Sequence, residues 1–92
     1  MTPQSEAQIL TQVREFVERE FLYMRPGFKL GDADNLMKAG VVDSMGVLEV
    51  MSFLETTFGV TPADDEITET NLGSLQAIAR FVESKNASSP AT

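Results

Sequence analysis

The chain has 92 residues, of which 42% are hydrophobic, and this length and composition suit one small globular domain. It contains no cysteine and no histidine, which excludes disulfides, thiolate metal sites, cysteine nucleophiles and the usual general base at neutral pH. The formal net charge of −7 arises in one stretch, residues 39–79, where seven acids occur without a base; we expect this stretch either to attract basic protein surfaces while repelling nucleic acid, or to serve only solubility.

A first helix is expected to begin after Ser5, a good N-cap that forms a capping-box pattern with Gln8. Its end is expected at the Pro-Gly pair of positions 26–27. Glu15 and Arg19 are four residues apart, in the favourable order for a surface ion pair. The apolar face of this helix is predicted to comprise Ile9, Leu10, Val13, Phe16, Val17, Phe21 and Met24.

A long connection, residues 28–42, follows the first helix. Connections of this length inside a small domain are usually functional. Gly40 indicates a turn within it. Its apolar residues are expected to hold it across the helices, and they are Phe28, Leu30, Leu36, Met37, Val41 and Val42.

A second helix is expected to begin at Asp43 or Ser44, which are both good N-caps, and to stop at Gly59. Its buried face is predicted to comprise Met45, Leu48, Met51, Leu54 and Phe58. Because Val47 and Val50 are apolar as well, some apolar side chains of this helix must be exposed. Flanked by acidic residues, they would form a small docking surface with an acidic rim, unless the neighbouring elements cover both sides of the helix.

Two further helices are expected near the end of the chain. A short one spans Thr68 to Leu72, and a longer one begins after the N-cap Ser74. The apolar stripe of the longer helix is predicted to comprise Leu75, Ile78, Ala79 and Val82. Lys85 lies in its last turn, and residues 86–92 are expected to be a disordered tail, which leaves a domain of residues 1–85. The expected fold is all-α: a small four-helix bundle with three main helices, one short helix and a long first connection.

Catalysis is difficult to build from these residues. Without histidine or cysteine, a nucleophilic serine would need a lysine or carboxylate base, and the sequence has no G-x-S-x-G or S-x-x-K motif. Asp32 and Asp34 begin like a calcium loop, but Met37 stands where that loop needs glycine and Asp43 where it needs glutamate. The acidic run of positions 64–66 is typical of a solvated surface. We therefore expect neither an enzyme nor a metal site.

The informative segment is Gly40-Val41-Val42-Asp43-Ser44-Met45-Gly46. It places a serine hydroxyl at the tip of a loop where a helix starts. Such a position is exposed, and the helix N-terminus favours a phosphodiester beside it. From the local pattern alone, the alternative is that Ser44 serves only as an N-cap.

The wider context resembles the acyl carrier protein superfamily. The run L-M-K-A-G-V-V-D-S-M-G-V-L-E-V-M-S-F-L-E-T-T-F-G-V contains an Asp-Ser-Met signature at the start of the second helix, and D-D-E-I-T and L-G-S-L-Q-A-I-A-R-F-V follow downstream. The resemblance extends over nearly the whole domain, from the first helix to the Phe-Val pair at 81–82. Members of that superfamily are small helical bundles that carry a thioester-bound cargo between enzymes.

The resemblance implies a role for five residues. Ser44 would be the attachment point of a 4′-phosphopantetheine arm, donated from coenzyme A by a phosphopantetheinyl transferase that uses magnesium. Asp43 matches the signature acid beside that serine, which helps the transferase to dock. Met45, Glu49 and Glu55 match positions that contact partners. The other implied partners are an acyl- or aminoacyl-activating ligase and a downstream transferase or synthase.

The sequence departs from fatty-acid carriers at Gly46, where those proteins usually have a polar or acidic residue. The D-S-M-G string is more similar to D-alanyl and other aminoacyl carriers, and to some stand-alone carriers for adenylating ligases, so the cargo stays open. The alternative function is an acidic helical interaction module without a prosthetic group. No apolar run is long enough to span a membrane and no basic start precedes an apolar stretch, so we expect a cytoplasmic monomer without membrane insertion.

Overall fold

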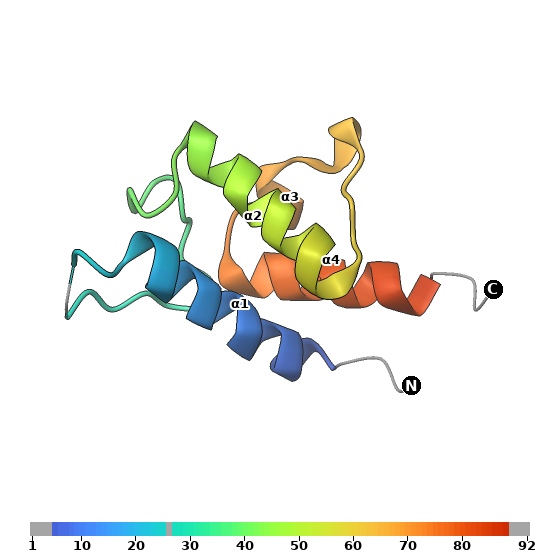
Figure 1. Cartoon of the computed structure of the whole chain (residues 1–92), viewed down its shortest axis with the longest axis horizontal. Helices are drawn as coiled ribbons and strands as arrows, with labels where there is room; N and C mark the ends of the chain where they lie inside the picture. Colours follow the sequence, from blue (N-terminus) through green and yellow to red (C-terminus); the bar gives the residue numbers. More distant parts are fainter. Residues whose placement is uncertain (1–4, 26, 89–92) are drawn as a thin grey trace.

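Four α-helices and one short 3-10 helix make up the regular structure of this computed structural model, which describes residues 5–25 and 27–88. The elements are α1 (Glu6–Phe21), α2 (Ser44–Phe58), η1 (Asp64–Glu66), α3 (Glu69–Leu72) and α4 (Leu75–Ser88). The residues described contain no strand, which confirms the predicted all-α bundle. Helices α1 and α4 pack against each other in opposite directions, α3 packs on α4, and α2 runs above α1 and α4 (Figure 1). Within the described ranges, no helix has the length and apolar character needed to cross a membrane.

The start of α1 follows the prediction. Ser5 N–H donates to the Gln8 side chain at 2.9 Å, and Gln8 N–H donates to the Ser5 hydroxyl at 3.3 Å, so both halves of the capping box are present. The predicted Glu15–Arg19 pair is wrong, because Arg19 instead bonds its neighbour Glu20, with Nε–Oε2 at 3.2 Å.

Helix α1 ends before the predicted point. Its last residue is Phe21, after which Arg25 N–H donates to the Leu22 carbonyl at 3.0 Å and turns the chain. The turn leaves Leu22 in the core but places Met24, expected on the buried face, at 75% exposure. Gly27 has a positive φ of 86°, consistent with a bend at this point, and Pro26 lies outside the described residues.

The long connection is held against the core as predicted. Leu36 is its most deeply buried side chain, and its N–H donates to the Gly73 carbonyl at 2.8 Å, just before α4. Gly40 forms the expected turn with a positive φ of 73°. Met37 departs from the prediction, because the turn that ends at Gly40 leaves its side chain exposed.

Helix α2 has the predicted length but presents a different face to the core. It stops at Gly59, which adopts the left-handed conformation with φ 69°. The buried residues of α2 are Gly46, Val50 and Leu54, in steps of four. Met45 and Leu48, both predicted to be buried, are 70% and 58% exposed. The row of Gly46, Val50 and Leu54 therefore replaces the predicted apolar face, because Gly46 lies against Phe21 and Val42 and the other two belong to the buried core.

The C-terminal part of the chain contains a short 3-10 helix that the sequence analysis did not predict. The acidic run predicted to be merely solvated forms η1, and Glu66 at its end bonds both Lys85 and the N–H of Ala63. These two contacts lower the pKa of the Glu66 carboxyl below its ordinary value. Ser74 caps α4 as predicted, with Ala77 N–H donating to its hydroxyl at 3.1 Å.

Helix α4 continues past the predicted domain boundary at residue 85. It runs to Ser88, so residues 86–88, which were expected to begin a disordered tail, belong to the helix. Residues 89–92 lie outside the described residues.

Two leucines of α2 test the corrected helix face. We expect Leu54→Ala to lower the free energy of unfolding by about 2–5 kcal/mol, because Leu54 is fully buried and its truncation leaves a cavity. Leu48→Ala, which removes the same atoms from an exposed position, should change it by less than about 0.5 kcal/mol. Urea unfolding followed by circular dichroism measures both values. Equal losses, or a larger loss for Leu48→Ala, would contradict the observed face.

Candidate functional site

The start of α2 is fixed by Asp43 rather than by the serine that follows it. Asp43 is the N-cap, with extended backbone, and its Oδ1 accepts a hydrogen bond of 2.7 Å from the N–H of Gly46. Its carbonyl accepts the first helical hydrogen bond, from the N–H of Val47 at 3.0 Å. Ser44 is therefore the first helical residue, and the interpretation of Ser44 as a cap is wrong.

Because Asp43 supplies the cap, the hydroxyl of Ser44 is left for other chemistry. Ser44 is exposed, and its hydroxyl bonds no other residue in the described part of the chain. The N–H groups of Ser44 and Met45 also lack a carbonyl partner there, as is usual in a first helical turn. These groups, together with the helix dipole, favour a negatively charged group beside Ser44.

Gly46 provides the space that this arrangement needs. Gly46 is buried, and a Cβ at this position would lie 2.9 Å from the Phe21 ring, 3.1 Å from Val42 and 3.3 Å from the Asp43 carboxylate. A larger residue would displace the ring or disturb the cap. The glycine that distinguishes the D-S-M-G string therefore has a local packing reason in this chain.

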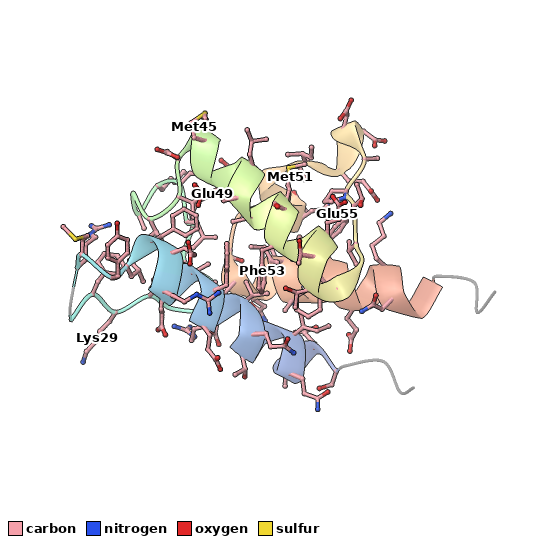
Figure 2. The ribbon with its side chains drawn as sticks, in the orientation of Figure 1. Lys29, Met45, Glu49, Met51, Phe53 and Glu55 are labelled. Atoms are coloured by element: carbon pink, nitrogen blue, oxygen red, sulfur yellow. The ribbon has the colours of Figure 1, made fainter. Side chains whose placement is uncertain are left out.

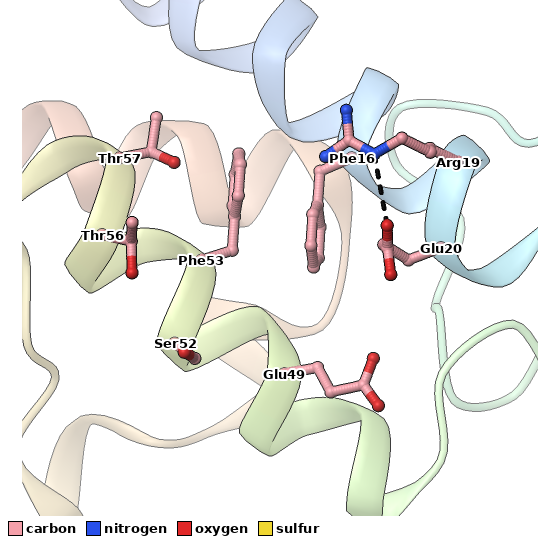
Figure 3. Close-up of a pocket in the computed structure, with 8 residues that line it drawn as sticks. All are labelled: Phe16, Arg19, Glu20, Glu49, Ser52, Phe53, Thr56 and Thr57. Carbon is pink, nitrogen blue, oxygen red and sulfur yellow. Dashed lines mark hydrogen bonds and ion pairs between the residues drawn. The ribbon is translucent and has the colours of Figure 1, made fainter.

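Two hollows lie between α1 and α2, and the smaller of them adjoins the start of α2. The smaller, of about 280 Å³, is bordered by Asp43, Met45 and Gly46, next to Ser44. The larger, of about 580 Å³, lies farther along α2 (Figure 3). Glu20 and Glu49 border both hollows, so the two are neighbours along α2, and we call them together the groove.

The groove has an aromatic floor and charged sides. The rings of Phe16 on α1 and Phe53 on α2 are stacked with their centroids 4.1 Å apart (Figure 3). Arg19 pairs with Glu20 on the α1 side, and Glu49 stands opposite them on α2 (Figure 3). The sequence did not single out the α1 residues of this groove, because nothing in a helical pattern shows which positions of two helices will meet.

The predicted partner-contacting residues lie on the outward side of α2. Met45 and Leu48 are the exposed apolar residues there, and Glu49 and Glu55 lie at its two edges (Figure 2). At 3.6 residues per turn, the two glutamates are separated by ~120° around the helix axis. We call these four residues the α2 face. The resemblance placed Met45, Glu49 and Glu55 here, whereas the helical pattern assigned both Met45 and Leu48 to the core. The i, i+4 row through Val50 was the signal that could have corrected it.

No protein-family model matches this chain, and no curated protein matches it.

The assignment of the cap to Asp43 gives a direct test. We expect Asp43→Ala to lower the free energy of unfolding by about 0.5–2 kcal/mol, because Gly46 N–H loses its acceptor. Ser44→Ala should change it by less than about 0.5 kcal/mol, because the exposed hydroxyl makes no contact to lose. Asp43→Asn, which keeps an acceptor oxygen, serves as the matched control. Thermal and urea unfolding of the three variants measure the difference. A larger loss of unfolding free energy for Ser44→Ala than for Asp43→Ala would indicate that Ser44 is the N-cap.

Proposed function

We propose that this chain is a carrier protein that holds an acyl or aminoacyl group as a thioester on a 4′-phosphopantetheine arm attached to Ser44. The observation that carries the proposal is the environment of that hydroxyl. Ser44 is exposed at the first position of a 15-residue helix, and its neighbour Asp43 has taken the capping role. A serine that is not needed for the helix start can be modified without cost to the fold.

The residues around Ser44 fit a phosphodiester. The N–H groups of Ser44 and Met45 are available to an anionic group, and the N-terminus of α2 favours its charge. The carboxylate of Asp43 is held by Gly46 N–H, next to the serine, where it would help a magnesium-dependent transferase to dock. The arm would supply a terminal thiol for thioester chemistry, which a chain without cysteine cannot provide. The chain itself would position this arm and present it.

The α2 face suits contact with partner enzymes. It combines two exposed apolar side chains, Met45 and Leu48, with an acid at each edge. The apolar part begins at Met45, directly after Ser44. Apolar contact holds a docked complex, whereas charges at a rim mainly guide and speed its formation. The proposed partners are the phosphopantetheinyl transferase, an acyl- or aminoacyl-activating ligase and a downstream transferase or synthase, each with a basic surface.

A second function uses the same surface without an arm. The exposure of Met45 and Leu48 is also what an acidic helical interaction module would need to bind a basic partner. The two functions differ in one measurable respect, which is whether Ser44 becomes modified.

Intact-mass spectrometry provides that measurement. After incubation with coenzyme A, magnesium and a permissive phosphopantetheinyl transferase, we expect the wild-type chain to gain the mass of one phosphopantetheine. Peptide mapping should place it on Ser44. Ser44→Ala should gain nothing, and Ser52→Ala, which removes another exposed serine of α2, should gain the same mass as the wild type. A wild-type chain that stays unmodified by several transferases would favour the interaction module.

The acidic edges of the α2 face yield a kinetic prediction. Glu49→Lys combined with Glu55→Lys should slow association with the transferase and weaken the salt dependence of that rate, because attraction is replaced by repulsion. Glu15→Lys with Glu18→Lys on α1 makes the same change in net charge and serves as the control. Stopped-flow association at low and high salt measures both. If the two double variants behave alike, only the net charge matters and the α2 face is not the docking surface.

A further inference from the structure

The cations of this chain fall into two groups. Four of the seven bases form ion pairs: Arg14 with Glu18 and Asp32, Arg19 with Glu20, Arg80 with Glu6, and Lys85 with Glu66. Within the described ranges, the other three, Arg25, Lys29 and Lys38, have no carboxylate partner. All three lie on the connection between α1 and α2.

The same connection exposes large apolar side chains. Tyr23 and Met24 are 70% and 75% exposed, and Met37 is also exposed. These three make up most of the large apolar side chains that are exposed in the described part of the chain. The remaining two, Met45 and Leu48, belong to the α2 face. We call the six residues Tyr23, Met24, Arg25, Lys29, Met37 and Lys38 the connection patch.

Arg25 brings the two parts of the connection patch together. Its guanidinium lies over the Phe28 ring, 4.4 Å from the centroid, and its Nη1 donates to the Gly40 carbonyl at 3.3 Å. Gly40 closes the turn that begins at Met37, through a hydrogen bond of 3.1 Å. Arg25 therefore joins the segment after α1 to the turn that carries Met37 and Lys38, at the end of the bundle where Lys29 lies (Figure 2).

The acids closest in sequence to the connection patch are already engaged. Asp32 pairs with Arg14, the Asp34 carboxylate accepts the N–H of Gly31 at 2.8 Å, and Glu20 pairs with Arg19. The hydrogen bond to Asp34 leaves the charge of that carboxylate in place, but none of these acids forms an ion pair with a cation of the patch in the described part of the chain. Arginine, methionine and aromatic side chains are enriched in protein-binding surfaces, and the patch combines such residues with two further unpaired cations at its edges.

We infer that the connection patch is a second docking surface, which binds an acidic protein surface that also offers apolar contact. Its charge is opposite to that of the α2 face, although the two surfaces lie on consecutive parts of the chain. A protein that contacts both would need a basic area for the α2 face and an acidic area for the connection patch. Two contacts of opposite charge would fix the orientation of the bound protein.

A protein suits this surface better than a lipid bilayer or a second copy of the chain. An anionic bilayer would attract the three cations of the patch. Because the bilayer is extended, it would also face the acids of a chain with a net charge of −7 and repel them. Two copies each carry a net charge of −7, which disfavours their approach at long range, and pairing of the patch with the α2 face of a second copy is an outcome that the test below separates. An acidic protein surface can be confined to the area of the patch, so that it meets the cations without facing the acids of residues 39–79.

The experiment titrates a defined probe into the isotope-labelled chain and follows backbone amide shifts by NMR. The probe is a synthetic peptide that alternates glutamate with leucine, and a peptide with lysine in place of glutamate is its control. We expect shifts centred on residues 23–25, 29 and 37–40 with the acidic peptide only. Lys29→Gln with Lys38→Gln should weaken binding by at least about fivefold, as expected for the loss of two exposed charge contacts.

Arg19→Gln with Arg80→Gln makes the same change in net charge but removes cations that are already paired, and it should alter the affinity by less than about twofold. Met24→Ser, at an exposed position, should also weaken binding. Circular dichroism confirms that each variant is folded. Equal effects of the two double variants, or shifts spread over the molecule, would overturn the inference. Tighter binding to phosphatidylglycerol vesicles than to the peptide, or sedimentation showing self-association through the patch, would overturn it in favour of a bilayer or a second copy.

Discussion

The hydrogen bond of 2.7 Å between the Asp43 carboxylate and the N–H of Gly46 is the contact on which the candidate site depends. It ends the long connection, starts α2 and places Ser44 at the first helical position with its hydroxyl unused. Glycine at position 46 suits this arrangement for another reason, because the Phe21 ring from α1 lies 2.9 Å from where a Cβ would sit. Cap, glycine and ring therefore form one unit that sets the position of α2 relative to the end of α1.

Aromatic side chains extend this unit along the two helices. The ring of Phe21 meets Phe16 edge-on at 5.9 Å, Phe16 stacks on Phe53, and Phe53 meets Phe58 edge-on at 5.7 Å. Helices α1 and α2 are thus joined by large rings, which keep their backbones far enough apart for a groove to remain beside the rings. Helix α4 packs directly on α1 and leaves the outward side of α2 uncovered. This unequal packing explains why apolar residues are exposed on α2, where partners are proposed to bind.

Local signals in the sequence predicted the helix starts and the stop of α2 well, because a cap or a glycine stop depends on a few neighbouring residues, whereas the ends of α1 and α4 were misplaced. The capping box at Ser5, the stop at Gly59 and the cap at Ser74 were all correct. The buried face of α2 was not predictable in the same way. That helix has apolar residues on most of its sides, so its orientation is decided by what packs against it, namely the Phe21 ring at Gly46. The sequence located the Ser44 region, but the groove and the connection patch depend on contacts between distant segments, such as that from Arg25 to Gly40.

The ion pair of Glu66 with Lys85 makes the bundle sensitive to acid at one particular place. Because folding lowers the pKa of this carboxyl, the folded chain binds its proton less readily than the unfolded chain does. The stabilisation from the pair is therefore complete at neutral pH and disappears as the pH falls through the lowered pKa. Protonation at that point removes the tie between η1 and α4. Helices α1 and α4 are joined by carboxylates too, at Glu6 and Glu83, but their contact rests mainly on buried apolar side chains that do not titrate. Acidification should loosen the segment of η1 and α3 before it separates the main helices, a local opening that amide hydrogen exchange would resolve from global unfolding.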